Sequence, residues 1–152
     1  MTINRRQFLA EGTLTALGLA VLGRTAGAQD KPSLKVYKSP SCGCCSKWID
    51  HMRANGFDVT VEDMDDVSPI KARYKVAQPL ESCHTAIVDG YVIEGHVPAA
   101  DVKRLLKERP KVVGLTIPGM PQSAPGMDVT PHQPYEVLAF DVRGKTTVYA
   151  KY

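Results

Sequence analysis

The stretch LKVYKSPSCGCCSKWIDHMRANGFDVTV, residues 34–61, decides how this chain folds. Its first five residues alternate between apolar and polar side chains, as a half-buried strand does. Apolar residues at helical spacing follow, and Asn55–Gly56 is typical of a helix end. Phe57–Val61 then alternates again. The stretch therefore predicts a β-α-β unit, with a helix from Cys44 or Cys45 to Asn55 and a cysteine cluster where the first strand turns into the helix.

Further elements follow this unit. Ser68–Pro69 suits the start of a short helix, Asp89–Gly90 is a strong hairpin signal, and Pro110 ends a helix. The expected elements are a helix over 68–74, strands over 85–88 and 91–93, a helix over 98–108, and a final hairpin over 135–141 and 146–149. Residues 112–134 hold five prolines and are expected to form a long irregular loop.

The first 28 residues have the features of an export signal. Arg5 and Arg6 are followed by the apolar stretch 14–22 and by small residues at 26–28. This pattern predicts a bacterial twin-arginine signal peptide over 1–28, a mature domain over 29–152, and a periplasmic location. The alternative, a membrane anchor, needs about 20 apolar residues, roughly twice what is present.

Length and charge exclude several classes of protein. The chain has 152 residues, which is typical of one domain, and its 43% hydrophobic and 23% charged content excludes collagen-like, disordered and coiled-coil proteins. The formal net charge is +3, and the first 28 residues, with three arginines against one glutamate, supply two of these charges. The rest of the chain therefore has no field that would favour nucleic acid.

The cysteine cluster, Cys42-Gly43-Cys44-Cys45, needs a chemical explanation. It contains a C-x-x-C pair, and the start of a helix favours thiolate over thiol. Such thiolates can attack a disulfide or bind a soft metal such as Cu(I) or Zn. Because Cys44 is surplus to a two-cysteine redox centre, spacing alone does not decide between these uses.

A second pair of reactive residues, Cys83-His84, precedes the third expected strand. The entrance to that strand is expected beside the first strand-to-helix turn, which would bring four sulfurs and an imidazole together. We favour a metal or redox role. The alternative is a pair of structural disulfides, in which Cys42 or Cys45 bonds to Cys83.

Two methionines, Met120 and Met127, lie in the irregular loop. A thioether is a soft ligand suited to Cu(I), although both side chains could equally fasten the loop to the core. For His51, His96 and His132 we expect ordinary surface or core roles.

Several motifs together resemble one known family. These are the twin-arginine leader, Cys42-Gly43-Cys44-Cys45, Ser82-Cys83-His84-Thr85, Gly95-His96-Val97-Pro98, and Pro118-Gly119-Met120-Pro121 with Pro125-Gly126-Met127. They resemble the CopG-like family of periplasmic copper-resistance proteins, long catalogued as a domain of unknown function. The resemblance implies a mixed α/β, thioredoxin-like sheet with flanking helices. It also implies copper binding, most simply as Cu(I), and exchange with periplasmic copper carriers or redox partners. The implied ligands are Cys42, Cys44, Cys45 and Cys83, with His84, Met120 and Met127 as further candidates.

Three hypotheses therefore remain at this point. The protein could hold Cu(I) in a cysteine cluster for copper homeostasis or resistance. It could act as a thiol-disulfide oxidoreductase, with Cys42 as the nucleophile and Cys45 as the resolving thiol. It could also be a structural domain cross-linked by disulfides, with neither bound metal nor a reactive thiol.

Overall fold

The structure is a computed structural model that describes residues 31–127 and 129–152. The predicted signal peptide, residues 1–28, lies outside the described residues. Among the residues described, no helix is long and apolar enough to cross a membrane.

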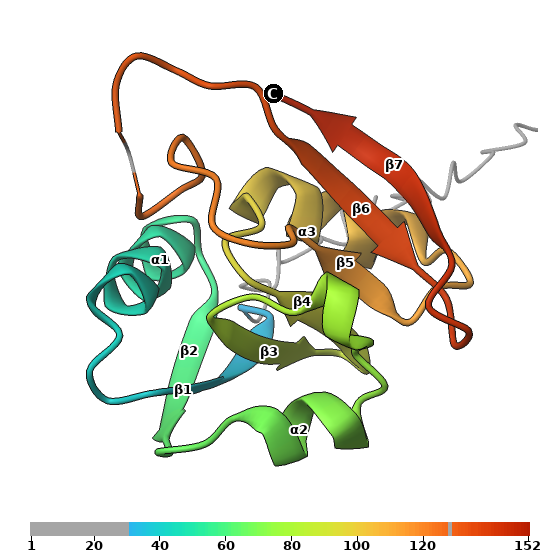
Figure 1. The fold of residues 1–152 in the computed structure, drawn as a ribbon, viewed down its shortest axis with the longest axis horizontal. Coiled ribbons are helices and arrows are strands. Elements are labelled where there is room, and N and C mark those ends of the chain that lie inside the picture. Colours follow the sequence, from blue (N-terminus) through green and yellow to red (C-terminus); the bar gives the residue numbers. More distant parts are fainter. Residues whose placement is uncertain (1–30, 128) are drawn as a thin grey trace, which may run out of the picture.

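A seven-stranded mixed sheet forms the centre of the molecule (Figure 1). Its strands are β1 (Ser33–Lys38), β2 (Asp58–Asp63), β3 (His84–Val88), β4 (Tyr91–Glu94), β5 (Gly114–Thr116), β6 (Glu136–Phe140) and β7 (Thr146–Lys151). They are ordered β2-β1-β3-β4-β5-β6-β7. The β1–β2 and β4–β5 pairs are parallel, and all other neighbours are antiparallel. The helices are α1 (Gly43–Ala54), α2 (Ser68–Arg73), the 3₁₀ helix η1 (Gln78–Leu80) and α3 (Ala99–Glu108).

The predicted mixed α/β class is confirmed, as are the first β-α-β unit and both hairpins. A closer relation to thioredoxin stays a prediction. The expected irregular loop was wrong at residues 114–116, which form β5 and join the final hairpin to the main sheet. A three-residue strand is too short to give a periodic signal, and the surrounding prolines favoured a loop. Gly114 is required here, because a Cβ at this position would overlap the Val92 carbonyl on β4.

The two faces of the sheet carry two separate apolar clusters. Neighbouring residues on β4 point to opposite faces, so Ile93 packs in the larger cluster and Val92 in the smaller one. The larger cluster includes Trp48 of α1 and Leu105 of α3, both fully buried. The smaller cluster, on the other face, includes Leu80 of η1, and Tyr74 just after α2 packs against it. Figure 1 shows α2 on the side of the sheet opposite α3. Strands β3 and β4 therefore contact apolar clusters on both faces of the sheet, which holds their ends in place.

Four strand ends meet at one edge of the sheet. Lys38 at the end of β1 pairs with His84 at the start of β3, and Thr85 of β3 pairs with Glu94 at the end of β4. Glu94 in turn pairs with Thr116 at the end of β5. The segments that begin or end at these positions therefore lie next to one another, although they are far apart in the sequence.

Candidate metal centre

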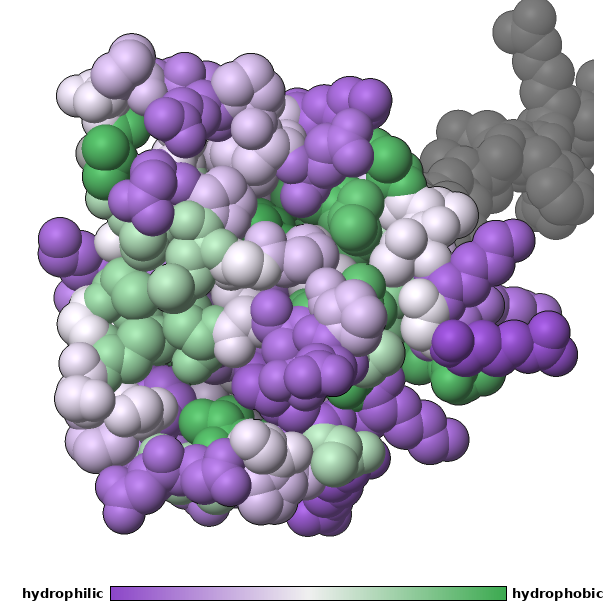
Figure 2. All heavy atoms as spheres, viewed as in Figure 1, coloured by the Kyte–Doolittle hydropathy of each residue, from purple (hydrophilic) through white to green (hydrophobic). Residues whose placement is uncertain are grey.

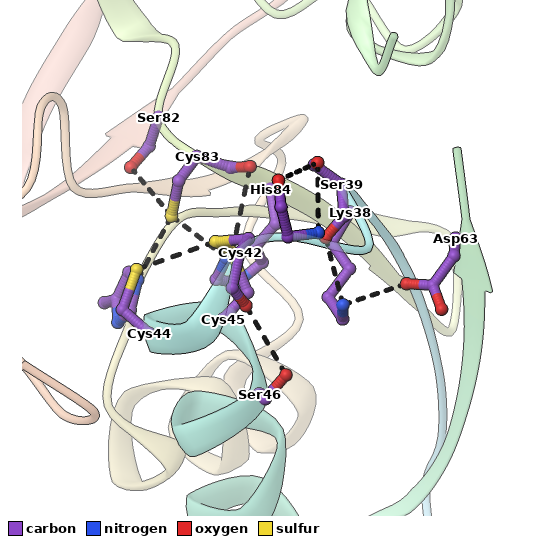
Figure 3. Close-up of a disulfide and its surroundings, with 12 residues drawn as sticks. Lys38, Ser39, Cys42, Cys44, Cys45, Ser46, Asp63, Ser82, Cys83 and His84 are labelled. Atoms are coloured by element: carbon purple, nitrogen blue, oxygen red, sulfur yellow. Dashed lines mark hydrogen bonds and ion pairs between the residues drawn. A yellow bond between two sulfur atoms is a disulfide. The ribbon is translucent and has the colours of Figure 1, made fainter. Parts of the chain in front are cut away.

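The four cysteines gather at this edge of the sheet. Cys42 is the N-cap of α1 and Cys44 and Cys45 lie in its first turn, shortly after β1, and Cys83 immediately precedes β3. Their sulfur atoms all lie within 4.8 Å of one another, and the Cys42 and Cys44 sulfurs are 3.6 Å apart. Figure 3 shows Cys83, just before β3, facing the start of α1. The expected meeting of four sulfurs with an imidazole is therefore present in the structure.

Two of these cysteines are joined. Cys42 and Cys45 form a disulfide, whereas Cys44 and Cys83 are free. The cross-link spans only the first turn of α1, so it closes a very small loop and constrains the unfolded chain little. Neither Cys42 nor Cys45 bonds to Cys83, which is the pairing that the alternative of structural disulfides required. The arrangement therefore favours a metal-binding or redox role for these cysteines over a structural cross-link.

A buried ion pair holds the backbone that carries Cys83. Lys71 of α2 and Glu94 of β4 pair directly, and both are almost fully buried. Lys71 Nζ also donates to the Ser82 carbonyl oxygen at 3.0 Å, while the Ser82 backbone N–H donates to Glu94 Oε1 at 2.6 Å. Both backbone groups of Ser82 are thereby fixed, which limits where the next residue, Cys83, can place its sulfur.

His84 contributes a buried imidazole to the cluster. Its Nδ1 lies 3.3 Å from Cys83 Sγ, and its ring packs against Trp48 with 4.4 Å between ring centroids. Its Nε2 is buried and has no hydrogen-bond partner among the described residues. Burial lowers the pKa of His84 well below its usual range, and the nearby charges of His96, Lys71 and Lys38 act in the same direction. The imidazole is therefore neutral at pH 7, as a metal ligand must be.

His96 is a site residue that the sequence analysis missed. It follows β4 at the same edge of the sheet, is 1% exposed, and places Nε2 3.1 Å from Cys83 Sγ. We had expected an ordinary surface or core role, and the structure places the ring in the interior beside Cys83, where it is also a candidate ligand. The signal in the sequence was the position of His96 just after the Asp89–Gly90 hairpin, because the second strand of a hairpin ends beside the start of the first.

Cys83 itself is held as a thiol in the metal-free protein. Burial raises its pKa to about 12, and the nearby Cys44 adds to this effect. A metal ion that binds this sulfur must therefore displace a proton, so binding is coupled to pH.

The long loop is fastened to the site at two points. Gly119 accepts a hydrogen bond from the Ser82 hydroxyl through its carbonyl oxygen at 2.6 Å. Gly126, with a φ of 87°, lies so close to α1 that a Cβ would come within 2.7 Å of the Trp48 backbone nitrogen and 3.1 Å of the Cys44 carbonyl oxygen. Between these points the Pro125 carbonyl oxygen lies 2.7 Å from His96 Nδ1. The loop therefore borders the cysteine cluster on two sides.

The methionines follow these two glycines. Met120 is 49% exposed, whereas Met127 is partly buried. In the space-filling view a weakly hydrophobic area lies over the α1 side of the molecule, with hydrophilic side chains around it (Figure 2). Both thioethers are thus carried by segments adjacent to the cysteines, and their role as ligands stays a prediction.

His51 and Lys38 lie outside the cysteine cluster and have different roles. His51 Nε2 accepts a hydrogen bond from the Ala99 backbone N–H at 3.1 Å and so satisfies the start of α3. Lys38 is 6% exposed, and its Nζ pairs with an Asp63 carboxylate oxygen at 2.9 Å. The structure therefore places a second buried cation near His84.

The donor set fits a thiophilic metal ion. Sulfur and imidazole nitrogen are the soft and borderline ligands that select copper and zinc over magnesium or calcium. All four sulfurs become available once the disulfide gains two electrons and two protons. The fold and site together define an α/β metal-binding protein with a cysteine cluster.

The chain belongs to the CopG family of copper resistance proteins. Two solved structures titled copper resistance protein CopG, forms 2 and 1, are 42% identical to the chain, with TM-scores of 0.76 and 0.75. Each alignment covers 80% of this chain and 98% of the other. Residues 80–127 match a family model described as a protein of unknown function, DUF411. The curated proteins include no match to the chain.

We predict that the stability of the metal-free protein falls in acid because of His84. The unfolded chain binds a proton on this imidazole below about pH 6.5, whereas the folded chain does so only at a much lower pH, so acid favours unfolding. The contribution is at most about 1.4 kcal/mol per pH unit. Urea unfolding across this range should show a smaller pH slope for His84→Leu than for the parent. The exposed His132→Leu is the control, and an equal slope in His84→Leu would contradict the prediction.

Replacing Gly126 by alanine should destabilise the protein more than replacing Gly119. Both have positive φ, 87° and 69°, so each variant bears a backbone strain of about 1–2 kcal/mol. Only Gly126 lies against other atoms, the backbone of α1, which adds about 1–3 kcal/mol. Urea unfolding measures the difference, and limited proteolysis of residues 118–134 detects release of the loop. Equal effects in the two variants would show that this contact is unimportant.

Proposed function

We propose that the reduced protein binds Cu(I) through Cys42, Cys44, Cys45 and Cys83 and serves copper homeostasis or resistance in the periplasm. The observation that carries this proposal is the convergence of four sulfur atoms within 4.8 Å. Thiolates are the preferred ligands of Cu(I), and the start of α1 favours the thiolate form of its cysteines. Because a thiolate can bridge two ions, four close sulfurs also suit a cluster of several Cu(I) ions.

The relatives support copper as the metal. Two solved structures that share 42% of their residues with the chain are named copper resistance proteins. A copper-related role for the cysteine cluster follows from this similarity together with the donor chemistry. The predicted twin-arginine leader supports a periplasmic location, where copper carriers or redox partners would exchange metal or electrons with the protein.

His84, Met120 and Met127 are proposed as further ligands. His84 presents a neutral imidazole 3.3 Å from Cys83 Sγ. Met120 follows Gly119, whose carbonyl oxygen accepts a hydrogen bond from the Ser82 hydroxyl. Met127 follows Gly126, which lies against the Cys44 carbonyl oxygen.

A second candidate function is thiol-disulfide exchange. The observation in its favour is the disulfide between Cys42 and Cys45 at the first turn of α1. A partner thiolate would attack one of these sulfurs, form a mixed disulfide and release the other as a thiolate, and a second thiol would complete the two-electron reduction. Metal analysis of protein purified without oxygen from copper-supplemented cells separates the two functions. Copper well above trace supports the first, and metal-free protein with a readily reduced disulfide supports the second.

Replacement of single cysteines should abolish most Cu(I) binding. In anaerobic competition titrations of the reduced protein, Cys42→Ser, Cys45→Ser and Cys83→Ser are each expected to bind fewer Cu(I) ions and to bind them more weakly, because a hydroxyl is a poor ligand for a soft ion. Ser41→Ala, which alters the exposed neighbour of Cys42, is the matched control and should bind as the parent does. Unchanged copper content in the cysteine variants would refute the assignment.

The two loop methionines should contribute most to Cu(I) affinity at acidic pH. Thioethers need no deprotonation, so their contribution persists where protons compete for the thiolates. A Met120→Ala, Met127→Ala double variant is therefore expected to lose proportionately more Cu(I) affinity at acidic than at neutral pH. Competition titrations at both pH values measure this, with Met64→Ala, just after β2, as a control. Affinity equal to that of the parent at both values would show that the two methionines only pack the loop.

A further inference from the structure

The end of β1 carries a buried lysine that is not a candidate ligand. Lys38 is 6% exposed, whereas the side chain of Lys35 on the same strand is 48% exposed. Residues two apart in a strand point to the same face, so Lys38 shares its face with Leu34 and Val36, which pack in the larger apolar cluster. A lysine at such a core-facing position is uncommon, because burial of the ammonium group costs free energy unless that group is paired.

Two contacts fix the position of the Lys38 ammonium group. Its Nζ donates to the Ser39 carbonyl oxygen at 3.0 Å and pairs with an Asp63 carboxylate oxygen at 2.9 Å. The Ser39 carbonyl oxygen also accepts from the Cys42 backbone N–H at 3.1 Å. Lys38 and Cys42 therefore share one acceptor, and the lysine holds the turn that carries Cys42 at the start of α1.

The positive charge of Lys38 lies beside the cysteine cluster. Lys38 is directly opposite His84 in the register of β1 and β3, and side chains opposite each other lie on the same face of a sheet. His84 in turn places Nδ1 3.3 Å from Cys83 Sγ. Figure 3 shows Lys38 between His84 and Asp63. One neighbouring side chain thus separates the strand position of Lys38 from a sulfur of the cluster.

The ion pair leaves much of the Lys38 charge effective in the interior. Lys71, which is also buried, pairs with Glu94, and this carboxylate is fully buried as well. The Asp63 side chain is 53% exposed, so water screens its charge far more than it screens the buried ammonium group. Negative charge on the cysteines would therefore meet an uncompensated positive charge on the β1 side.

We propose that Lys38 is a positioning residue of the cysteine cluster, which holds the Ser39–Cys42 turn and supplies a buried positive charge that favours anionic sulfur. A disulfide is neutral, whereas thiolates are anionic. Four thiolates around fewer than four Cu(I) ions leave a net negative charge, which a nearby buried cation offsets. The effect on metal binding rests on the proposed function, whereas the effect on the disulfide does not.

The metal-free test is the equilibrium of the Cys42–Cys45 disulfide with dithiothreitol, which gives two electrons and two protons and itself becomes a cyclic disulfide. The protein is equilibrated at pH 7 without oxygen and alkylated, and mass spectrometry distinguishes two free thiols from four. Lys38→Met keeps an apolar stem and removes the charge. It should need a roughly three- to tenfold higher ratio of dithiothreitol to cyclic disulfide for half reduction. A ratio equal to that of the parent would overturn the proposal.

Two variants separate this role from a structural one. Asp63→Asn breaks the same ion pair but keeps the cation, so it should need a lower ratio than the parent. A shift in the same direction in Lys38→Met and Asp63→Asn would indicate a structural role of the pair and overturn the proposal. Lys35→Met, which breaks the exposed pair with Glu62 on the same strand, is the matched control and should behave as the parent does.

Circular dichroism shows that each variant is folded. If Lys38→Met does not fold, the direction of the shift in Asp63→Asn decides. A lower ratio than that of the parent supports the proposal, and an equal or higher ratio overturns it.

Anaerobic competition titrations measure the effect on Cu(I) separately. Lys38→Met removes no proposed ligand, so it should bind as many Cu(I) ions as the parent but about three- to tenfold more weakly. Affinity equal to that of the parent would overturn the role of Lys38 in metal binding. If the parent itself binds no Cu(I), the proposed function is refuted, and the metal-free equilibrium alone decides the role of Lys38.

Discussion

The buried pair of Lys71 and Glu94 is the interaction on which the site depends. Burial raises the pKa of Glu94, while Lys71 and the hydrogen bonds to the carboxylate act in the opposite direction. The carboxylate accepts from Lys71, from the Thr85 hydroxyl at 2.7 Å and from the Ser82 N–H. Removing one partner of such a pair leaves an uncompensated buried charge, at a cost of about 3–5 kcal/mol. The pair therefore links α2, β3 and β4 next to the backbone that carries Cys83.

This constraint lets three separate segments supply one donor cluster. The first turn of α1 contributes its cysteines, the entry to β3 contributes Cys83 and His84, and the exit of β4 contributes His96. The loop before β6 adds the Pro125 carbonyl that orients His96. Each donor sits on or beside a regular element, so the geometry of the cluster is set by the sheet register rather than by loop conformation.

The oxidation state of Cys42 and Cys45 changes which donors are available. With the disulfide formed, the sulfur-rich set loses two of its four members, while the sulfur and imidazoles around Cys83 are unaffected. Reduction restores a soft, thiolate-rich site. The number of sulfurs free to bind a metal thus depends on the redox state of two residues at the start of one helix.

The sequence alone determined the elements and the soft chemistry. Periodicity marked the first β-α-β unit, Asp89–Gly90 marked the hairpin, and the cysteine spacing indicated a metal or redox centre. These features depend on residues close in the chain, where local geometry decides the outcome. Only the tertiary structure revealed β5, the buried Lys71–Glu94 pair and the role of His96. The reason is that each depends on the pairing of strands that are distant in the sequence. A three-residue strand has no period of its own. An isolated histidine becomes a candidate ligand only when Thr85 pairs with Glu94 and thereby brings His96 to Cys83.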